Sequence, residues 1–132
     1  MLPKMGNRKS LLQTPAKIFT TSTINSLTRK MLLRVILDYG SRKTIIHRSD
    51  LPKGIVTVPI NGATLTTLSG KMSATEMITM RDFRLPEFDK NKRVGEQKSL
   101  VFDTPCRYGI ILGTDLLRKS GIKINYETGF MG

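Results

Sequence analysis

The sequence has little of the chemistry on which disulfides, metal sites or membrane spans depend. Cys106 is the only cysteine and His47 the only histidine among 132 residues. An intramolecular disulfide is therefore impossible, and neither a metal site nor a cofactor is expected. No apolar run approaches the roughly 20 residues of a membrane-spanning helix, and no secretory signal is recognised. We therefore expect an intracellular, cytoplasmic protein with no membrane partner.

The two rare residues do not indicate a catalytic pair. Nothing in the local sequence brings Cys106 and His47 together for nucleophilic catalysis. We interpret Cys106 as a small buried hydrophobe and His47 as a polar residue at a strand end.

Acidic residues are also scarce, since the chain has 10 of them and 22 basic residues. Residues 1–34 contain no acidic residue and seven basic ones, namely Lys4, Arg8, Lys9, Lys17, Arg29, Lys30 and Arg34. Such a leader is typical of a transit peptide, an RNA-attracting arm or a solvated linker. We favour the linker, because like charges repel and resist packing. The predicted organisation is a basic, flexible N-terminal tail or linker at 1–30 and a folded domain at 31–132.

The net charge of +12 does not by itself predict a nucleic-acid-binding domain. Phe and Tyr make up 6% of the chain and Trp is absent, so no stacking platform is evident. We expect no nucleic-acid partner for the folded domain, and only weak contact by the tail.

Short apolar runs separated by turn signals begin near residue 31. These runs, rich in Ile, Val, Leu and Thr, predict strands at 31–38, 43–47, 54–60, 64–68, 75–83, 99–102, 108–112 and 122–126. Asn61-Gly62 is a hairpin signal, and the charged segment 84–98 is predicted to be an exposed loop. Eight strands at this spacing indicate an all-β protein, either a small barrel or two packed sheets.

One short helix is predicted at 114–121. Thr114 or Asp115 can cap its first amides, and Gly121 can end it in the left-handed conformation.

The stretch Ile36-Leu37-Asp38-Tyr39-Gly40-Ser41 places an aspartate at the end of an apolar strand. Asp-x-Gly is a common turn, and most such aspartates only bond their own backbone. Here apolar strands on both sides would hold the carboxylate at a buried or half-buried site. The later string IILGTDLL, at 110–117, is a buried strand that stops at Gly113 and turns into the capped helix.

Together these motifs resemble the retropepsins, the aspartic peptidases of retroviruses and retrotransposons. The closer resemblance is to the protease region of gypsy-type long-terminal-repeat retrotransposon polyproteins, through LLRVILDYGSRKTIIHRSDLPKG, LPEFDKNKRV and VFDTPCRYGIILGTDLLRKSGIKINYE. It spans about residues 31–131. It implies a small closed β-barrel of the acid-protease type with one short C-terminal helix.

The resemblance also assigns site residues. Asp38 would be catalytic, in an active-site loop completed by Tyr39, Gly40 and Ser41. The strand and turn packed behind this loop would be formed by Ile111, Leu112 and Gly113. A flap would correspond to the hairpin near 62–75, with Gly70 as its tip or hinge. We further hypothesise an ion pair between Arg42 and Asp115, against the alternative that Asp115 only caps the helix.

Peptide hydrolysis of this kind needs two facing carboxylates, and aspartic proteases are the standard example of a proton shared between them. The chain has one Asp-x-Gly, since Asp103-Thr104-Pro105 has proline where glycine is needed. The resemblance therefore implies a homodimer that cleaves a peptide or polyprotein substrate.

Tyr39 departs from the family pattern, which has Thr or Ser at this position. Two tyrosine rings near one twofold axis would crowd, and relatives usually continue the last strand beyond the position of Met131-Gly132. The alternative prediction is therefore a catalytically inactive retropepsin-like binding or structural module.

Overall fold

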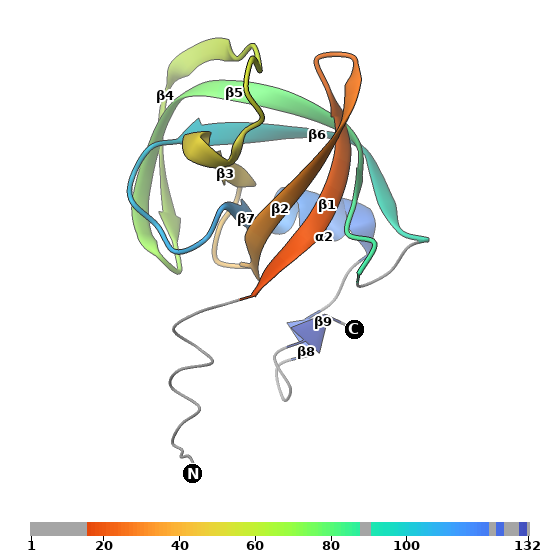
Figure 1. Cartoon of the computed structure of the whole chain (residues 1–132). Helices are drawn as coiled ribbons and strands as arrows, with labels where there is room; N and C mark the ends of the chain where they lie inside the picture. The colour runs from red at the N-terminus through yellow and green to blue at the C-terminus, as the bar shows by residue number, and fades with distance from the viewer. Residues whose placement is uncertain (1–15, 88–90, 122–123, 126–129, 132) are drawn as a thin grey trace.

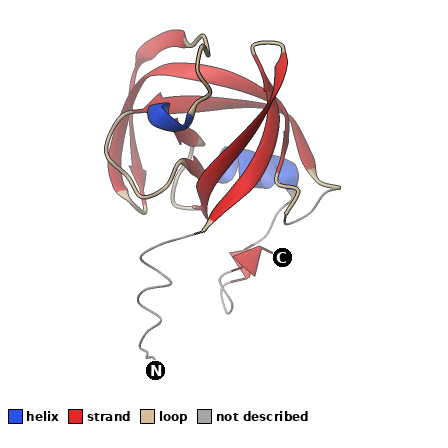
Figure 2. Ribbon diagram, viewed as in Figure 1, coloured by secondary structure: helices blue, strands red, loops and turns tan. Residues whose placement is uncertain are grey.

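A computed structural model describes residues 16–87, 91–121, 124–125 and 130–131 of the chain (Figure 1). Its elements in chain order are β1 (Lys17–Ile24), β2 (Leu27–Leu37), β3 (Ile45–His47), the 3-10 turn η1 (Arg48–Asp50), β4 (Val58–Thr67), β5 (Gly70–Arg84), β6 (Arg93–Phe102), β7 (Ile110–Leu112), α2 (Thr114–Ser120), β8 (Ile124–Asn125) and β9 (Phe130–Met131). Strands dominate the described residues (Figure 2). None of the described helices is long and apolar enough to cross a membrane.

The main sheet closes into a barrel. Its strand order is β1-β2-β7-β3-β6-β5-β4, and β1 also pairs with β5 through Thr21 opposite Arg84 and Thr23 opposite Arg81. Six strands therefore form a ring, while β4 pairs with β5 as a hairpin that extends from it. The prediction of an all-β closed barrel with one short helix is confirmed.

The barrel interior is filled by alternate residues of its strands. The larger cluster packs Phe83, Met80 and Ile110 with Leu116 and Leu117 of α2. Burying a side chain of this size contributes about 1.5–3 kcal/mol. Helix α2 is thereby fixed against the barrel, and it ends at Gly121, whose φ of 72° is left-handed. The predicted helix at 114–121 agrees with α2.

The predicted tail boundary at residue 30 is wrong, because residues 17–24 form β1 and residues 27–30 belong to β2, and every residue of β1 pairs with β2. The inward positions of β1 include Thr20 and Ser22, which weaken the apolar alternation. Their hydroxyls bond Met31 O (3.4 Å) and Arg81 O (2.9 Å), so burial leaves neither unpaired. Residues 1–15 lie outside the described residues.

Two other local predictions are corrected. Residues 93–98 belong to β6 rather than to a loop, because Val94 and Gln97 face inward between charged outward residues. Asn61-Gly62 lies inside β4, near a register shift, and the hairpin reverses instead at Leu68-Ser69.

The other predicted strands overlap observed ones. The predicted strands at 54–60 and 64–68 both overlap the single strand β4. Of the predicted strand 122–126, the described Ile124–Asn125 is β8. The remaining predictions overlap β2, β3, β5, β6 and β7, at 31–38, 43–47, 75–83, 99–102 and 108–112.

Candidate active site

Asp38 lies at the first position after β2. This strand runs parallel to β7, with Leu37 opposite Leu112, and the Asp38 N–H continues the ladder by donating to Leu112 O (2.9 Å). The chain then turns, and Ser41 N donates to Asp38 O (3.1 Å). Asp38 is 1% exposed, so the predicted burial of its carboxylate is observed.

Backbone amides hold both carboxylate oxygens of Asp38. Gly40 N donates to Oδ1 (2.8 Å) and Leu68 N donates to Oδ2 (2.8 Å). A Cβ at Gly40 would lie 3.0 Å from Oδ1, so glycine leaves the carboxylate room. Within the described part of the chain no Lys or Arg forms an ion pair with Asp38. Neutral N–H donors therefore fix the orientation of this acid.

Gly113 packs directly against the loop that follows Asp38. A Cβ at Gly113 would lie 2.4 Å from Lys43 O and 2.8 Å from Ser41 O, distances that only glycine allows. Thr114 N donates to Ser41 O (2.9 Å), and Ser41 Oγ donates to Lys43 O (2.8 Å). Behind the loop, the fully buried residues of β7 include Ile111 and Leu112. These contacts brace the turn that carries Asp38.

The hypothesised ion pair between Arg42 and Asp115 is wrong. The Asp115 carboxylate instead accepts bonds from Thr44 N (3.2 Å), Thr44 Oγ1 (2.8 Å) and Gln97 Nε2 (2.7 Å). It also accepts from Leu116 N (2.8 Å) within the first turn, but the N-cap of α2 is Gly113, so the alternative that Asp115 only caps the helix is wrong as well. Arg42 is exposed and contributes its carbonyl, which accepts from Thr114 Oγ1 (3.4 Å).

Sequence reasoning missed Thr44 and Gln97, which complete this network. Thr44 Oγ1 also accepts from Gly113 N (3.1 Å), so one hydroxyl joins the Asp38 loop, the glycine and the helix. A polar residue before the apolar pair Ile45-Ile46 was the only signal for Thr44. Nothing in the charged segment around Gln97 distinguishes it, although it is 2% exposed and its Oε1 lacks a partner in the structure.

The β4–β5 hairpin covers Asp38. Its turn is Leu68-Ser69, and Gly70 begins β5 with a φ of 103°, which favours glycine. Thr67 Oγ1 donates to Gly70 O (2.9 Å) and accepts from Ser69 N (3.0 Å), so the turn is internally bonded. The segment 62–75, expected from the resemblance to form a flap, includes this turn. The hydrogen bond from Leu68 N to Asp38 Oδ2 was not expected from the sequence.

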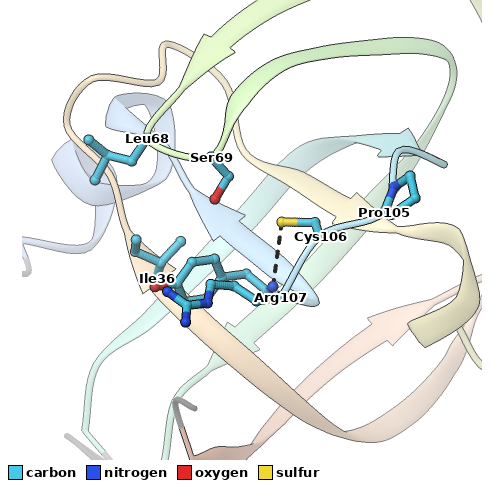
Figure 3. A pocket seen from close by; sticks show the side chains of 7 residues that line it. Ile36, Leu68, Ser69, Pro105, Cys106 and Arg107 are labelled. Carbon is cyan, nitrogen blue, oxygen red and sulfur yellow. Dashed lines mark hydrogen bonds between the residues drawn. The ribbon is translucent and has the colours of Figure 1, made fainter. Parts of the chain in front are cut away.

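A pocket of about 520 Å³ lies beside the turn of the β4–β5 hairpin (Figure 3). Ile36 reaches it from β2, Leu68 and Ser69 from the hairpin turn, and residues 105–108 from the segment before β7. Within that segment Tyr108 N donates to Cys106 Sγ (3.4 Å), the dashed line in Figure 3. Leu68 lines the pocket and its amide bonds Asp38, so this one residue links the pocket to the acid.

An exposed cluster of ion pairs holds the start of the segment 103–108, part of which lines this pocket. Arg48 bonds Asp103 through Nε (2.7 Å) and Glu76 through Nη1 (2.5 Å). These hydrogen bonds lower the pKa of both the Asp103 and Glu76 carboxyls and raise the pKa of Arg48. The cluster therefore ties η1 to β5 and to the start of the 103–108 segment.

Tyr39, the residue after the acid, is 38% exposed. Its ring is thus at the surface beside Asp38. Within the described residues no group of three or more His, Cys, Asp or Glu side chains is placed to hold a metal ion.

A closed barrel that holds a buried aspartate in an Asp-x-Gly turn beneath a hairpin defines an aspartic protease fold of the single-domain type. A family model described as retroviral aspartyl protease matches residues 17–125. The chain belongs to the retroviral aspartyl protease family. A search of curated proteins finds no match.

Proposed function

We propose that the chain is an aspartic endopeptidase that works as a homodimer and cleaves a retroelement polyprotein of the gypsy type. The observation that carries this proposal is Asp38. Its buried carboxylate stands at a strand end and is held by two backbone amides, one of them from Leu68, which also lines a pocket. This arrangement fits an acid that acts on a bound peptide rather than one that only closes its own turn.

A second copy has to complete the site, because the reaction needs two facing carboxylates. Three other described aspartates have other partners: Asp82 pairs with arginines, Asp103 with Arg48, and Asp115 belongs to the helix network. A twofold axis beside Asp38 would bring the same residue from each chain together.

In this dimer the ionised carboxylate removes a proton from a water molecule as the water oxygen attacks the scissile carbonyl carbon. The protonated partner donates a hydrogen bond, and then its proton, to the carbonyl oxygen. When the tetrahedral intermediate collapses, the C–N bond breaks and the first carboxyl passes its proton to the leaving nitrogen. The second carboxylate recovers a proton from the intermediate's hydroxyl, so the pair returns to its starting state.

The hairpin has to move for this to happen. In the single chain Leu68 N donates a hydrogen bond to Asp38 Oδ2. In the dimer this oxygen is needed to bind the water molecule or the partner's carboxyl group. Lifting of β4–β5 would free this oxygen and open the neighbouring pocket to substrate. The hairpin then acts as the flap that closes over a bound peptide.

The test is cleavage of a fluorogenic peptide library at mildly acidic pH, with sedimentation of the same samples. We expect a species of twice 14.8 kDa and cleavage that pepstatin blocks. Asp38→Asn should abolish cleavage, whereas the surface control Asp82→Asn, whose partners Arg84 and Arg93 do not line the pocket, should retain it. Cleavage that survives Asp38→Asn would contradict the proposal.

A second candidate is a catalytically inactive binding or structural module, and Tyr39 favours it. Two such rings near one axis would overpack at a cost of about 1–3 kcal/mol per site. Under this alternative the unaltered chain neither pairs nor cleaves, and Tyr39→Thr restores the dimer mass. Asp38-dependent cleavage by the unaltered chain would eliminate it.

A further inference from the structure

The loop that follows the Asp38 turn carries two cations that the fold does not use. Arg42 and Lys43 are both exposed, and within the described part of the chain neither forms an ion pair. Arg42 O accepts from Thr114 Oγ1 (3.4 Å). Lys43 O accepts from Ser41 Oγ (2.8 Å). The backbone of the loop is therefore held in place, while its two charged side chains are left to solvent.

One acidic group adjoins this loop from the side of the helix. Thr44, the next residue, bonds the Asp115 carboxylate through N (3.2 Å) and Oγ1 (2.8 Å). The same carboxylate accepts from Gln97 Nε2 and Leu116 N, so its hydrogen bonds come from neutral donors. Asp115 is half-buried, whereas the two cations are exposed. A molecule that approaches the surface of the loop therefore meets positive charge first.

The loop lies within range of a peptide bound over Asp38. Ser41 N donates to Asp38 O (3.1 Å), which closes a turn whose first and fourth Cα atoms are less than about 7 Å apart. The Cα of Arg42 follows about 3.8 Å later, so it lies within about 11 Å of the Asp38 Cα. An extended peptide advances about 3.4 Å per residue, so its second and third residues from the scissile bond lie about 7 and 10 Å away. Arg42 and Lys43 therefore lie at the distance of these two substrate positions.

The pocket beside the β4–β5 turn is also free of negative charge. Among the described residues that line it there is one basic residue, Arg107, and no acidic one. The guanidinium carbon of Arg107 lies 5.9 Å from the centroid of the Tyr108 ring. An acidic side chain that enters this pocket therefore meets no carboxylate of its lining.

We propose that Arg42 and Lys43 select peptides that carry acidic side chains two or three residues from the scissile bond. This selection rests on the proposed peptidase function, because it assigns a substrate class to the same site. In the proposed dimer the twofold axis would place one such loop on each side of the bond, so acidic residues would be favoured on both sides. Charges interact over about 10 Å at 0.1 M salt and about 3 Å at 1 M, so the preference is sensitive to salt.

The test compares three peptides that share one apolar centre and carry Glu, Gln or Lys at the second and third residues on each side of it. One exposed charge contact changes binding by roughly 1.5- to 5-fold, so replacing attraction by repulsion at two contacts changes it about tenfold. We expect kcat/KM for the Glu peptide to exceed that for the Lys peptide by about tenfold at about 0.1 M salt. At about 1 M salt the ratio should fall below about threefold.

Charge reversal identifies the residues responsible. Arg42→Glu with Lys43→Glu should reverse the order of the Glu and Lys peptides. Arg42→Gln with Lys43→Gln should make the two equal, and it replaces the reversal should that unfold the chain. The matched control, Lys53→Glu with Arg118→Glu, makes the same change in net charge at exposed positions after η1 and in the last turn of α2. It should keep the ratio of the unaltered chain within about twofold.

Binding of the same peptides, labelled with fluorescein, to Asp38→Asn separates this selection from the peptidase activity. Tighter binding of the Glu peptide, measured by anisotropy, would support selection by charge even if the unaltered chain cleaves nothing, a result that contradicts only the peptidase. Equal or absent binding of the Glu and Lys peptides overturns the proposal, even if the chain cleaves peptides. The proposal is also overturned if the Arg42 and Lys43 variants leave the order of the peptides unchanged, or if the control pair shifts it equally.

Discussion

Replacing Gly113 with alanine would place a methyl group in a space that is already filled by backbone. The new Cβ would lie 2.4 Å from Lys43 O, 2.5 Å from Lys43 C and 2.8 Å from Ser41 O. The Ser41 carbonyl cannot retreat freely, because it accepts the Thr114 N–H at 2.9 Å. Either the turn that carries Asp38 moves, or the start of α2 moves away from it.

The cost follows from these contacts. Overpacking in a filled site costs about 1–3 kcal/mol, and three backbone clashes place Gly113→Ala at the upper end of that range. Loss of the bond between Thr114 and Ser41 adds about 1 kcal/mol. The expected total of about 4 kcal/mol is a large share of the roughly 5–15 kcal/mol that stabilises a typical domain.

Urea unfolding followed by circular dichroism checks this value, and Gly95→Ala is the matched control. Gly95 lies within β6, and a Cβ there would meet nothing within 4 Å. Alanine at this position should be neutral or stabilising by up to about 1 kcal/mol. If Gly113→Ala and Gly95→Ala unfold within about 0.5 kcal/mol of each other, the close approach of Gly113 to the Asp38 loop is not a constraint on this fold.

Two further predictions concern the polar contacts around the site. Arg48 lowers the pKa of Glu76 and Asp103, so its stabilising effect is present above the ordinary carboxyl pKa near 4 and is lost as the pH falls through the lowered values. The melting temperatures of the native chain and Arg48→Gln should therefore differ at pH 6 and converge near pH 2; a constant difference would count against this coupling. Thr44→Val removes the 2.8 Å donor to Asp115 Oδ1 and should cost about 1–3 kcal/mol in urea unfolding, and a change below 0.5 kcal/mol would show that the network is not needed for stability.

The fold class could be predicted from the sequence because the barrel strands are short, rich in β-branched residues and separated by clear turn signals. The N-terminal strand was missed for a physical reason. In β1 two of the four inward positions are Thr20 and Ser22, so the alternation that marks a half-buried strand is obscured while the local charge favours a tail. The string KIFTTSTI, dense in β-branched residues, was the available signal.

The candidate site could be predicted in part, because residues close in sequence were found and their distant partners were not. Asp38 and Gly40 belong to one short motif and Gly113 to another. The residues within each motif nearly determine its backbone geometry. The donors from Leu68 and Gln97 come from 30 residues after Asp38 and 18 residues before Asp115, and no local pattern links them. The expected charge pairing of Asp115 failed for the same reason, since neutral donors from Thr44, which precedes β3, and from Gln97 on β6 satisfy its carboxylate.

The bond between Leu68 and Asp38 connects the fold to the proposed activity. A hydrogen bond to a charged group contributes about 1.5–3 kcal/mol, so each chain gives up stability of this order when its hairpin lifts. In the proposed dimer, the partner's carboxylate and a bound peptide would have to supply that energy. The same contact that stabilises the single chain therefore opposes pairing, and overpacking at Tyr39 would oppose it further. Dimer formation is thus the step at which an active protease and an inactive module with this sequence would differ.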